Sequence, residues 1–295
     1  MTYPSKDLSV AAATPPGFAE ALPDEPLKVI EPRTSWLAID FAELRQYREL
    51  LYFLTWRDVK VHYRQAALGV TWAVLQPLLL MAIFTIFYSR LARVETGGVP
   101  YPLFAYAGVV LWTFFANAIT ASGNSLINNV NLITKVYFPR MLVPAAAVAA
   151  CLLHLAIASV VLIGMMLYYR VTPGARLLLL PPLILLTVLF ATAVGLWTAA
   201  LNVKYRDVRL LLPFGVQVWL LASSVIVPSS AVPQQWRWVP RINPMSAFIE
   251  GFRAILFGGS FDTPALVTAV VITTIALLAG VIVFRAMERS FADVI

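Results

Sequence analysis

Six long stretches of this chain contain no aspartate, glutamate, lysine or arginine, and together they cover most of residues 65 to 284. They are 65–89, 96–134, 141–169, 177–203, 210–236 and 263–284. A helix needs about 20 apolar residues to cross about 30 Å of hydrocarbon, and a charge at its centre costs at least about 2.5 kcal/mol. We therefore expect an all-α integral membrane protein with six transmembrane helices.

Composition and charge distribution support the same class. The chain is 60% hydrophobic and 13% charged, which is too apolar for a soluble domain and leaves no room for a large soluble enzyme. The net charge of +7 raises the question of nucleic acid. However, 15 of the 22 basic residues fall in the N-terminal region, the predicted cytoplasmic loops and the C-terminal end. This asymmetry predicts a multi-pass protein with both termini in the cytoplasm and no nucleic-acid partner.

Two segments precede the spans. Residues 1–35 are rich in proline and hold no apolar run, which predicts a flexible cytoplasmic tail. Residues 36–64 place Leu44, Tyr47, Leu51 and Leu54 at steps of three and four among charged residues, which predicts an amphipathic helix at the membrane interface. This helix either serves only as a membrane anchor or also docks a partner.

The transmembrane domain is expected over 65–290, with two irregular elements inside it. Residues 124–140 are rich in asparagine and end in a basic cluster, which predicts a short cytoplasmic helix. Residues 229–262 contain an apolar helix at 245–257 that rises only about 20 Å, so it is expected to be a re-entrant or surface-lying element. Glu250 and Arg253 lie at i and i+3 there, a spacing at which they are able to pair.

The sequence holds few groups that carry chemistry. No Gly-Lys-Ser or Gly-Lys-Thr occurs, so the chain has no phosphate-binding loop for ATP. His154 is the one ionisable side chain in the predicted spans, and it is either a packed residue or a proton relay. Two histidines without neighbouring carboxylates do not make a metal site, and Cys151 is the single cysteine. We expect no catalytic residues and no metal.

Aromatic residues make up 12% of the chain. They either pack in the core or line a path on which flat rings stack against sugars. The candidates for channel lining are Trp72, Tyr88, Tyr106, Trp112, Phe114, Phe115 and Trp219.

Four separated segments carry a resemblance to a known family. They are Tyr63-Arg64 through Leu68-Gly69 to Trp72 with Gln76-Pro77; Lys135-Val136-Tyr137-Phe138-Pro139-Arg140 with Pro144; Tyr205-Arg206-Asp207-Val208; and Asn243-Pro244 through Glu250 and Phe252-Arg253. With six spans and a basic amphipathic helix before them, these segments resemble the permease subunits of type-2 ATP-binding cassette exporters. The similarity covers residues 41 to 290 and is closest to the branch that exports lipid-linked O-antigen, capsule or teichoic-acid chains.

The resemblance implies how such a chain works. Two copies would pair around a channel in the cell inner membrane and sit on two copies of a separate ATPase, which binds ATP and Mg²⁺, so the chain itself would bind no cofactor. The cargo would be a lipid-linked polysaccharide. The residues that would transmit ATPase closure are Arg57, Lys60, Lys135, Phe138, Pro139 and Arg140. The residues of an external gate would be Asn243, Pro244, Glu250 and Arg253.

Three other functions remain open at this point. A drug or small-lipid exporter of the same type is disfavoured by the aromatic content and the polysaccharide-branch motifs. A membrane-embedded glycosyltransferase or acyltransferase needs clustered acidic or histidine residues near the interface, where only Glu250 and Asp262 lie among scattered arginines. A stand-alone channel is disfavoured because no ring-forming charge motif lies in any span.

Overall fold

The computed structural model describes residues 47–64, 69–91, 96–136 and 138–294. These residues belong to one compact unit, 36–295. The predicted tail 1–35, the beginning of the interface helix at 36–46 and the side chains of residues 62–70 lie outside the described residues.

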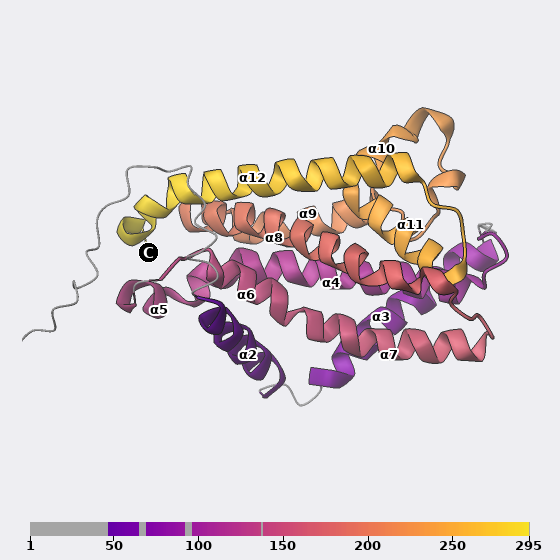
Figure 1. Ribbon diagram of the computed structural model, residues 1–295, viewed down its shortest axis with the longest axis horizontal. Coiled ribbons are helices and arrows are strands. Elements are labelled where there is room, and N and C mark those ends of the chain that lie inside the picture. The colour runs from indigo at the N-terminus through magenta and orange to yellow at the C-terminus, as the bar shows by residue number, and fades with distance from the viewer. Residues whose placement is uncertain (1–46, 65–68, 92–95, 137, 295) are drawn as a thin grey trace, which may run out of the picture. The chain divides into compact units, whose positions relative to one another are not determined.

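Every regular element in those ranges is a helix, which confirms the predicted all-α class (Figure 1). The elements are α2 (Arg48–Arg64), α3 (Gly69–Phe84), the π-helix η1 (Thr85–Leu91), α4 (Tyr101–Asn128), α5 (Val130–Lys135), α6 (Leu142–Ala150), α7 (Leu152–Tyr168), the 3₁₀-helix η2 (Ala175–Leu179), α8 (Leu180–Lys204), α9 (Val208–Leu221), the 3₁₀-helices η3 (Ser229–Ala231) and η4 (Gln234–Trp236), α10 (Trp238–Ile242), α11 (Pro244–Phe257) and α12 (Thr263–Val294).

Five helical segments of the described chain are long and apolar enough to cross a membrane. They are Thr71–Tyr88, Tyr101–Asn128, Leu142–Tyr168, Ala175–Lys204 and Thr263–Glu288. The stretch expected to form the fifth of six spans folds instead as the 14-residue helix α9, which rises about 21 Å and is shorter than the hydrocarbon layer. Five of the six predicted spans are therefore supported by the described helices, and the remaining one, at α9, stays a prediction.

The asparagine-rich segment differs from its predicted form. α4 continues to Asn128, about one and a half turns beyond the expected end of the second span. Its asparagines support this continuation, because the amides of Asn124 and Asn129 donate to the backbone oxygens of Thr120 and Ser125, at 2.9 and 2.8 Å. The predicted short helix is confined to α5, which carries Lys135 in its last turn.

α4 is the central helix of the described bundle. It packs against α3, α6, α7, α8, α9 and α11. Of the residues in its most apolar stretch, 83% are buried inside the bundle, compared with 11% for the corresponding stretch of α3. The rings of Tyr106, Phe114 and Phe115 are fully buried along it. A helix that is apolar on all sides can occupy the centre of a bundle, because every face can pack against an apolar neighbour.

Small residues bring α4 and α8 close together. A Cβ on Gly195 of α8 would lie 2.8 Å from the Cβ of Ser122 on α4, a distance that side chains do not tolerate. About two turns further along α8, Asn202 Nδ2 donates to Gly123 O at 2.8 Å. Close packing over small residues, together with hydrogen bonds between helices, is the usual way in which helices associate in lipid, where burial gives no hydrophobic gain.

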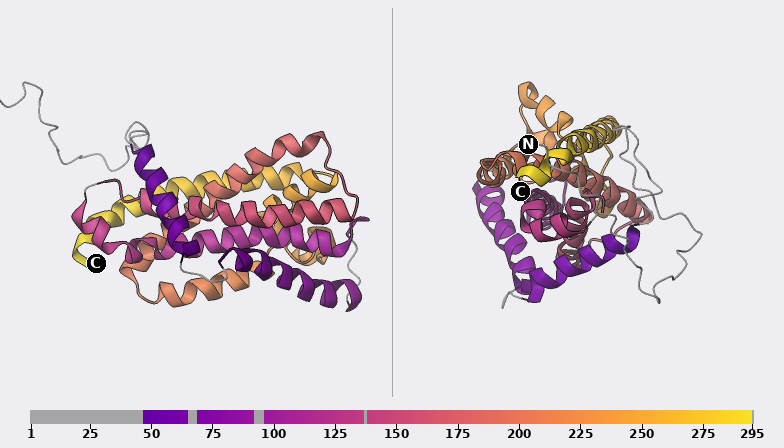
Figure 2. Two further views of the ribbon diagram at one scale, coloured as in Figure 1. Left: turned by 90° about the horizontal axis from the view of Figure 1, so that it is seen from below. Right: turned by 90° about the vertical axis from the view of Figure 1, so that its left-hand side faces the viewer.

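The two ends of the bundle carry different elements, as Figures 1 and 2 show. One end holds α2, α5 and the C-terminal end of α12; we call it the coupling end. The other holds η2, α10 and α11; we call it the gate end. The segments that the sequence assigns to ATPase contact and to the gate therefore lie at opposite ends of the same bundle.

Candidate functional site

At the coupling end, α2 lies against α6. Leu54 of α2 is buried, and Tyr47 and Leu51 pack against the same apolar cluster, so the helix turns the predicted apolar face to the bundle. Its opposite face exposes Tyr52, Phe53 and Trp56. An apolar aromatic surface beside basic residues is typical of a helix lying at the boundary of lipid and water.

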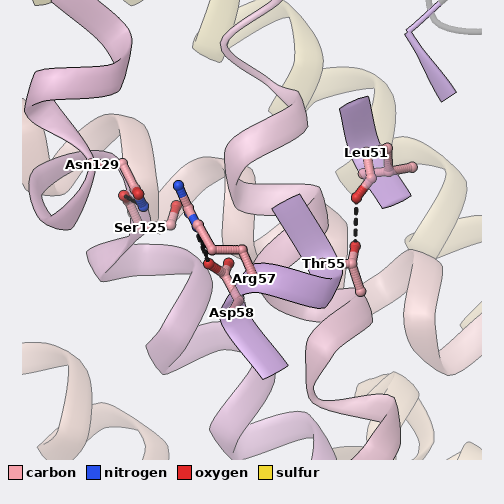
Figure 3. A network of polar contacts seen from close by, with 6 residues as sticks. All are labelled: Leu51, Thr55, Arg57, Asp58, Ser125 and Asn129. Carbon is pink, nitrogen blue, oxygen red and sulfur yellow. Dashed lines mark hydrogen bonds and ion pairs between the residues drawn. The ribbon is translucent and has the colours of Figure 1, made fainter. Parts of the chain in front are cut away.

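The two basic coupling candidates of α2 are held by local contacts. Arg57 donates to Asp58 Oδ1, with 2.7 Å between Nη2 and the oxygen, and Thr55 Oγ1 donates to Leu51 O (Figure 3). Lys60 Nζ lies 5.5 Å from the centre of the Trp56 ring. Lys60 is exposed, whereas Arg57 is only partly exposed.

The basic segment after α5 divides into exposed and embedded residues. Lys135 and Val136 are exposed. Phe138 is buried at 5% exposure in the apolar cluster of the coupling end. Arg140 Nη1 donates to Glu288 O on α12 at 2.9 Å, and its Nε lies 3.9 Å from the Glu288 carboxylate. Phe138 and Arg140 thus attach this segment to the bundle, while Lys135 remains available to a partner.

At the gate end, the chain between α9 and η3 is buried without being helical. Ser223, Ser224, Val225 and Ile226 are at most 7% exposed. Backbone groups buried in this way are costly unless they find partners, and irregular backbone at membrane depth is tolerated only inside protein or beside water. We call residues 222–227 the unwound segment.

Arg253 of α11 supplies partners for two of these backbone oxygens. Its Nη1 and Nη2 donate to Ser224 O and Val225 O, each at 2.6 Å, and its Nε donates to Phe104 O on α4 at 3.0 Å. The guanidinium carbon also lies 3.6 Å from the centre of the Phe104 ring. One side chain therefore ties α11, α4 and the unwound segment together, and its planar donors suit this task better than an ammonium group would.

The position of Arg253 is enclosed. The residue is 5% exposed, and burial lowers the pKa of its guanidinium to about 9, so it stays cationic at neutral pH. A Cβ on Gly108 of α4 would overlap Nη2 of Arg253 and lie 2.9 Å from Val225 O. Gly108 therefore leaves the space that the guanidinium occupies.

The other gate candidates lie on or beside α11, close to the same segment. Asn243 caps α11 by accepting from Met245 N at 3.1 Å, and Pro244 occupies the first turn. The Asn243 amide also donates to Ala222 O at 3.1 Å. Glu250 Oε1 accepts from Ser229 N at 2.7 Å. The pairing of Glu250 with Arg253 that the i, i+3 spacing allows is replaced by these separate bonds to backbone.

Three contributors to this network escaped the sequence analysis. Tyr101 donates to Ile226 O at 3.0 Å, Ser246 Oγ accepts from Ser224 N at 3.2 Å, and Gly108 supplies space. Of these three residues, only Gly108 is marked by its local sequence, as a glycine within an otherwise apolar span. The other two partners depend on contacts between residues more than 20 positions apart.

The aromatic candidates fall into two groups. Tyr106, Trp112, Phe114 and Phe115 are 0–4% exposed and pack inside the bundle. Phe115 stacks on Phe190 with ring centres 5.4 Å apart, and Trp219 meets both rings edge-on. Trp72 is 51% exposed on α3, and Tyr88 and Trp219 are partly exposed. In this conformation the first four contact other side chains, and channel lining stays a prediction for the whole set.

Groups of three or more potential metal ligands are absent from the described part of the chain. Cys151 is buried, and its lone thiol offers no metal site. The candidate site residues therefore form two groups: a hydrogen-bonded clamp of Arg253, Asn243 and Glu250 with residues 222–229 at the gate end, and a basic surface at the coupling end.

Comparison with known proteins places the chain in a class. The family model described as ABC-2 type transporter matches residues 49–257, so the chain belongs to the ABC-2 type transporter family, and it is the membrane permease rather than the ATPase.

Three curated relatives are similar over most of their length. The O-antigen export system permease protein RfbA of Klebsiella pneumoniae is 26% identical over 248 residues, which is 84% of this chain and 95% of the relative. The protein of the same description from Myxococcus xanthus is 25% identical over 254 residues, 85% of this chain and 97% of the relative. The polysialic acid transport protein KpsM of Escherichia coli is 20% identical over 243 residues, 79% of this chain and 92% of the relative.

Proposed function

We propose that this chain is the permease of an ATP-driven exporter that moves a lipid-linked polysaccharide, such as an O-antigen or capsule chain, across the cell inner membrane. The observation that carries the proposal is similarity over more than four fifths of the chain to two O-antigen export permeases. The family assignment supports a transport subunit whose ATP and Mg²⁺ are bound by a separate ATPase.

Energy would enter at the coupling end. Arg57, Lys60 and Lys135 present positive charge there, and the contact of Arg140 with Glu288 passes movement of the segment after α5 to α12. ATP binding in the partner biases the permease only if the partner's contacts differ between the two states. Rigid helices joined by such contacts are suitable for that purpose.

The gate would be α11 with the unwound segment. Arg253, Asn243 and Glu250 bind backbone groups of residues 222–229. Opening a path at this end requires α11 to move, and α11 carries the unwound segment with it because these bonds join them. The network therefore favours movement of α11 and residues 222–229 as one body.

The conduit would lie between two copies of the chain. α4 fills the centre of one bundle with packed aromatic rings, which leaves no room for a hydrated glycan there. α3 and α9 instead expose apolar side chains, among them Leu79, Ile83, Leu211 and Phe214. A homodimer built over such faces supplies a lumen that one protomer does not, and two ATPase copies match its symmetry.

Other functions have less support. A drug or small-lipid exporter of the same family is compatible with the fold, but the relatives described above carry polysaccharide cargo in their names. A transferase would need clustered acidic or histidine residues near the interface, where only Glu250 and Asp262 lie among scattered arginines. Here Glu250 accepts from Ser229 N and Asp262 accepts from Ala265 N, so each has one oxygen engaged with backbone.

Deletion of the gene tests the cargo. We expect the surface polysaccharide to disappear and its lipid-linked form to accumulate on the cytoplasmic leaflet, with both effects reversed by the intact chain. An affinity-tagged chain should also co-purify with an ATP-binding cassette ATPase. A deletion strain with normal surface glycan and an accumulated drug or small lipid would favour the rival exporter instead.

A further inference from the structure

A small polar cavity lies at the gate end, beside the clamp described above. Its volume is about 260 Å³. The residues that line it come from η3, η4–α10, α11 and the beginning of α12: Ser229, Ser230, Arg237, Pro240, Arg241, Ala247, Glu250, Asp262 and Ala265. Pockets for drug-sized ligands measure roughly 300–1,000 Å³, so this cavity suits a single small unit.

The polar atoms of the cavity are only partly engaged. Arg237 donates to Val232 O and Ser230 O. Glu250 and Asp262 each accept one backbone N–H through one oxygen, which leaves the second oxygen of each carboxylate for a ligand. Arg241 is exposed and has no hydrogen bond or ion pair to the described ranges of the chain. The cavity thus offers both donors and acceptors.

The balance of charge selects the class of ligand. Two arginines and two carboxylates line the same small space, so a bound anion would be repelled by the carboxylates and a bound cation by the guanidinium groups. A neutral polyhydroxyl molecule meets neither difficulty, because each hydroxyl both donates and accepts. Pro240, Ala247 and Ala265 add an apolar floor on which C–H groups can rest.

From this arrangement we propose that the cavity is a saccharide-binding site that holds one sugar unit of the exported glycan. Trp236 and Trp238, on either side of Arg237 in the sequence, are 54% and 56% exposed. Such tryptophans favour the boundary of lipid and water. The cavity then lies at headgroup depth, where the sugars nearest to a lipid anchor emerge. This inference rests on the proposed function for the identity of its ligand.

The test is direct binding to the purified full chain in lipid nanodiscs, measured by saturation-transfer NMR on the C–H protons of each probe. The probes are D-mannose, D-galactose, L-rhamnose and N-acetyl-D-glucosamine, with methyl phosphate and choline as the anionic and cationic comparisons. At least one sugar should bind, and Arg241→Gln should weaken it about tenfold, the effect of losing one hydrogen bond to a charged group. Asp262→Asn should weaken it similarly while keeping the helix cap.

Arg170→Gln is the matched control, because Arg170 is an exposed arginine of another loop and does not line the cavity. The proposal is overturned if none of the four sugars binds, if methyl phosphate or choline binds with the same sensitivity to Arg241→Gln, or if Arg170→Gln weakens sugar binding equally. Glycan export without sugar binding would reject the cavity and retain the proposed function. If the chain binds sugar but deletion of its gene leaves every surface glycan intact, the cavity is retained as a saccharide site and the proposed function is rejected.

Discussion

The guanidinium of Arg253 lies where backbone oxygens of α4 and the unwound segment converge, and Gly108 leaves room for it. A buried charge without a carboxylate is costly unless its donors are satisfied. Here three carbonyls and the face of Phe104 replace the water that the group has lost. The same bonds satisfy carbonyls that a helix would otherwise have used, so the arginine and the unwound segment depend on each other.

Replacing Gly108 with alanine should destabilise the permease. The new methyl group would displace Arg253 Nη2 and break at least one charge-assisted hydrogen bond, each worth about 1.5–3 kcal/mol. Gly164→Ala on α7 is the control, since nothing lies within 4 Å of its added Cβ and alanine favours a helix by about 1 kcal/mol. Thermal unfolding in detergent should show a lower midpoint for Gly108→Ala only. Equal midpoints for the two variants would contradict the account.

Arg253→Lys should abolish most export although the charge is kept. A single ammonium group does not reach Phe104 O, Ser224 O and Val225 O together, and each buried carbonyl left without a donor costs about 1–3 kcal/mol. Arg176→Lys is the matched change at an exposed arginine that also donates to carbonyls, those of Gly258 and Gly259, and should alter stability by less than about 0.5 kcal/mol. Export and unfolding measured for both variants check this. An Arg253→Lys chain that exports normally would show that the clamp is dispensable.

At the scale of elements, the segment around the end of α5 holds two kinds of residue. Phe138 and Arg140 attach it to the bundle, whereas Lys135 is exposed and available to a partner. Phe138→Ala should remove a buried ring at a cost of about 3–5 kcal/mol and lower the amount of chain in the membrane. Arg140→Ala breaks a partly exposed ion pair worth less than about 1 kcal/mol, so the chain should accumulate normally. In the complex with the ATPase, Arg140→Ala should hydrolyse ATP but export little. Wild-type export by this variant would remove Arg140 from the coupling route.

The elements differ in how far the sequence predicts them. Charge-free runs predict α3, α4, α6–α7, α8 and α12, because lipid excludes charge and demands length. The charge-free run 210–236 likewise predicts a full span, but α9 ends at Leu221. The cause lies elsewhere in the chain, since Arg253 and Asn243 offer bonds that compensate for leaving the helix. Local pattern does not contain that information.

The faces of the helices are predicted less well than the helices themselves. α4 and α3 are both apolar, yet one is the centre of the bundle and the other lies on its surface. The periodicity of an all-apolar helix does not mark an inner face. For this reason Phe114 and Trp72 look equivalent in the sequence, whereas the structure buries the first and exposes the second.

At the scale of the whole molecule, the proposed conduit between two chains predicts a defined assembly. The complex purified through a tagged chain should contain two permease copies and two ATPase copies. Native mass spectrometry of that complex measures the stoichiometry directly. A complex with a single permease copy that still exports glycan would contradict a conduit formed between two chains.

Reconstitution of that purified complex into proteoliposomes tests the central claim most directly. Lipid-linked polysaccharide supplied on the ATPase-facing leaflet is followed by its accessibility to a lectin on the opposite side. We predict that the cargo crosses only when the permease, the ATPase and Mg-ATP are all present, and that the permease alone moves none. Transport by the permease alone, or no transport by the complete complex with ATP, would contradict the account.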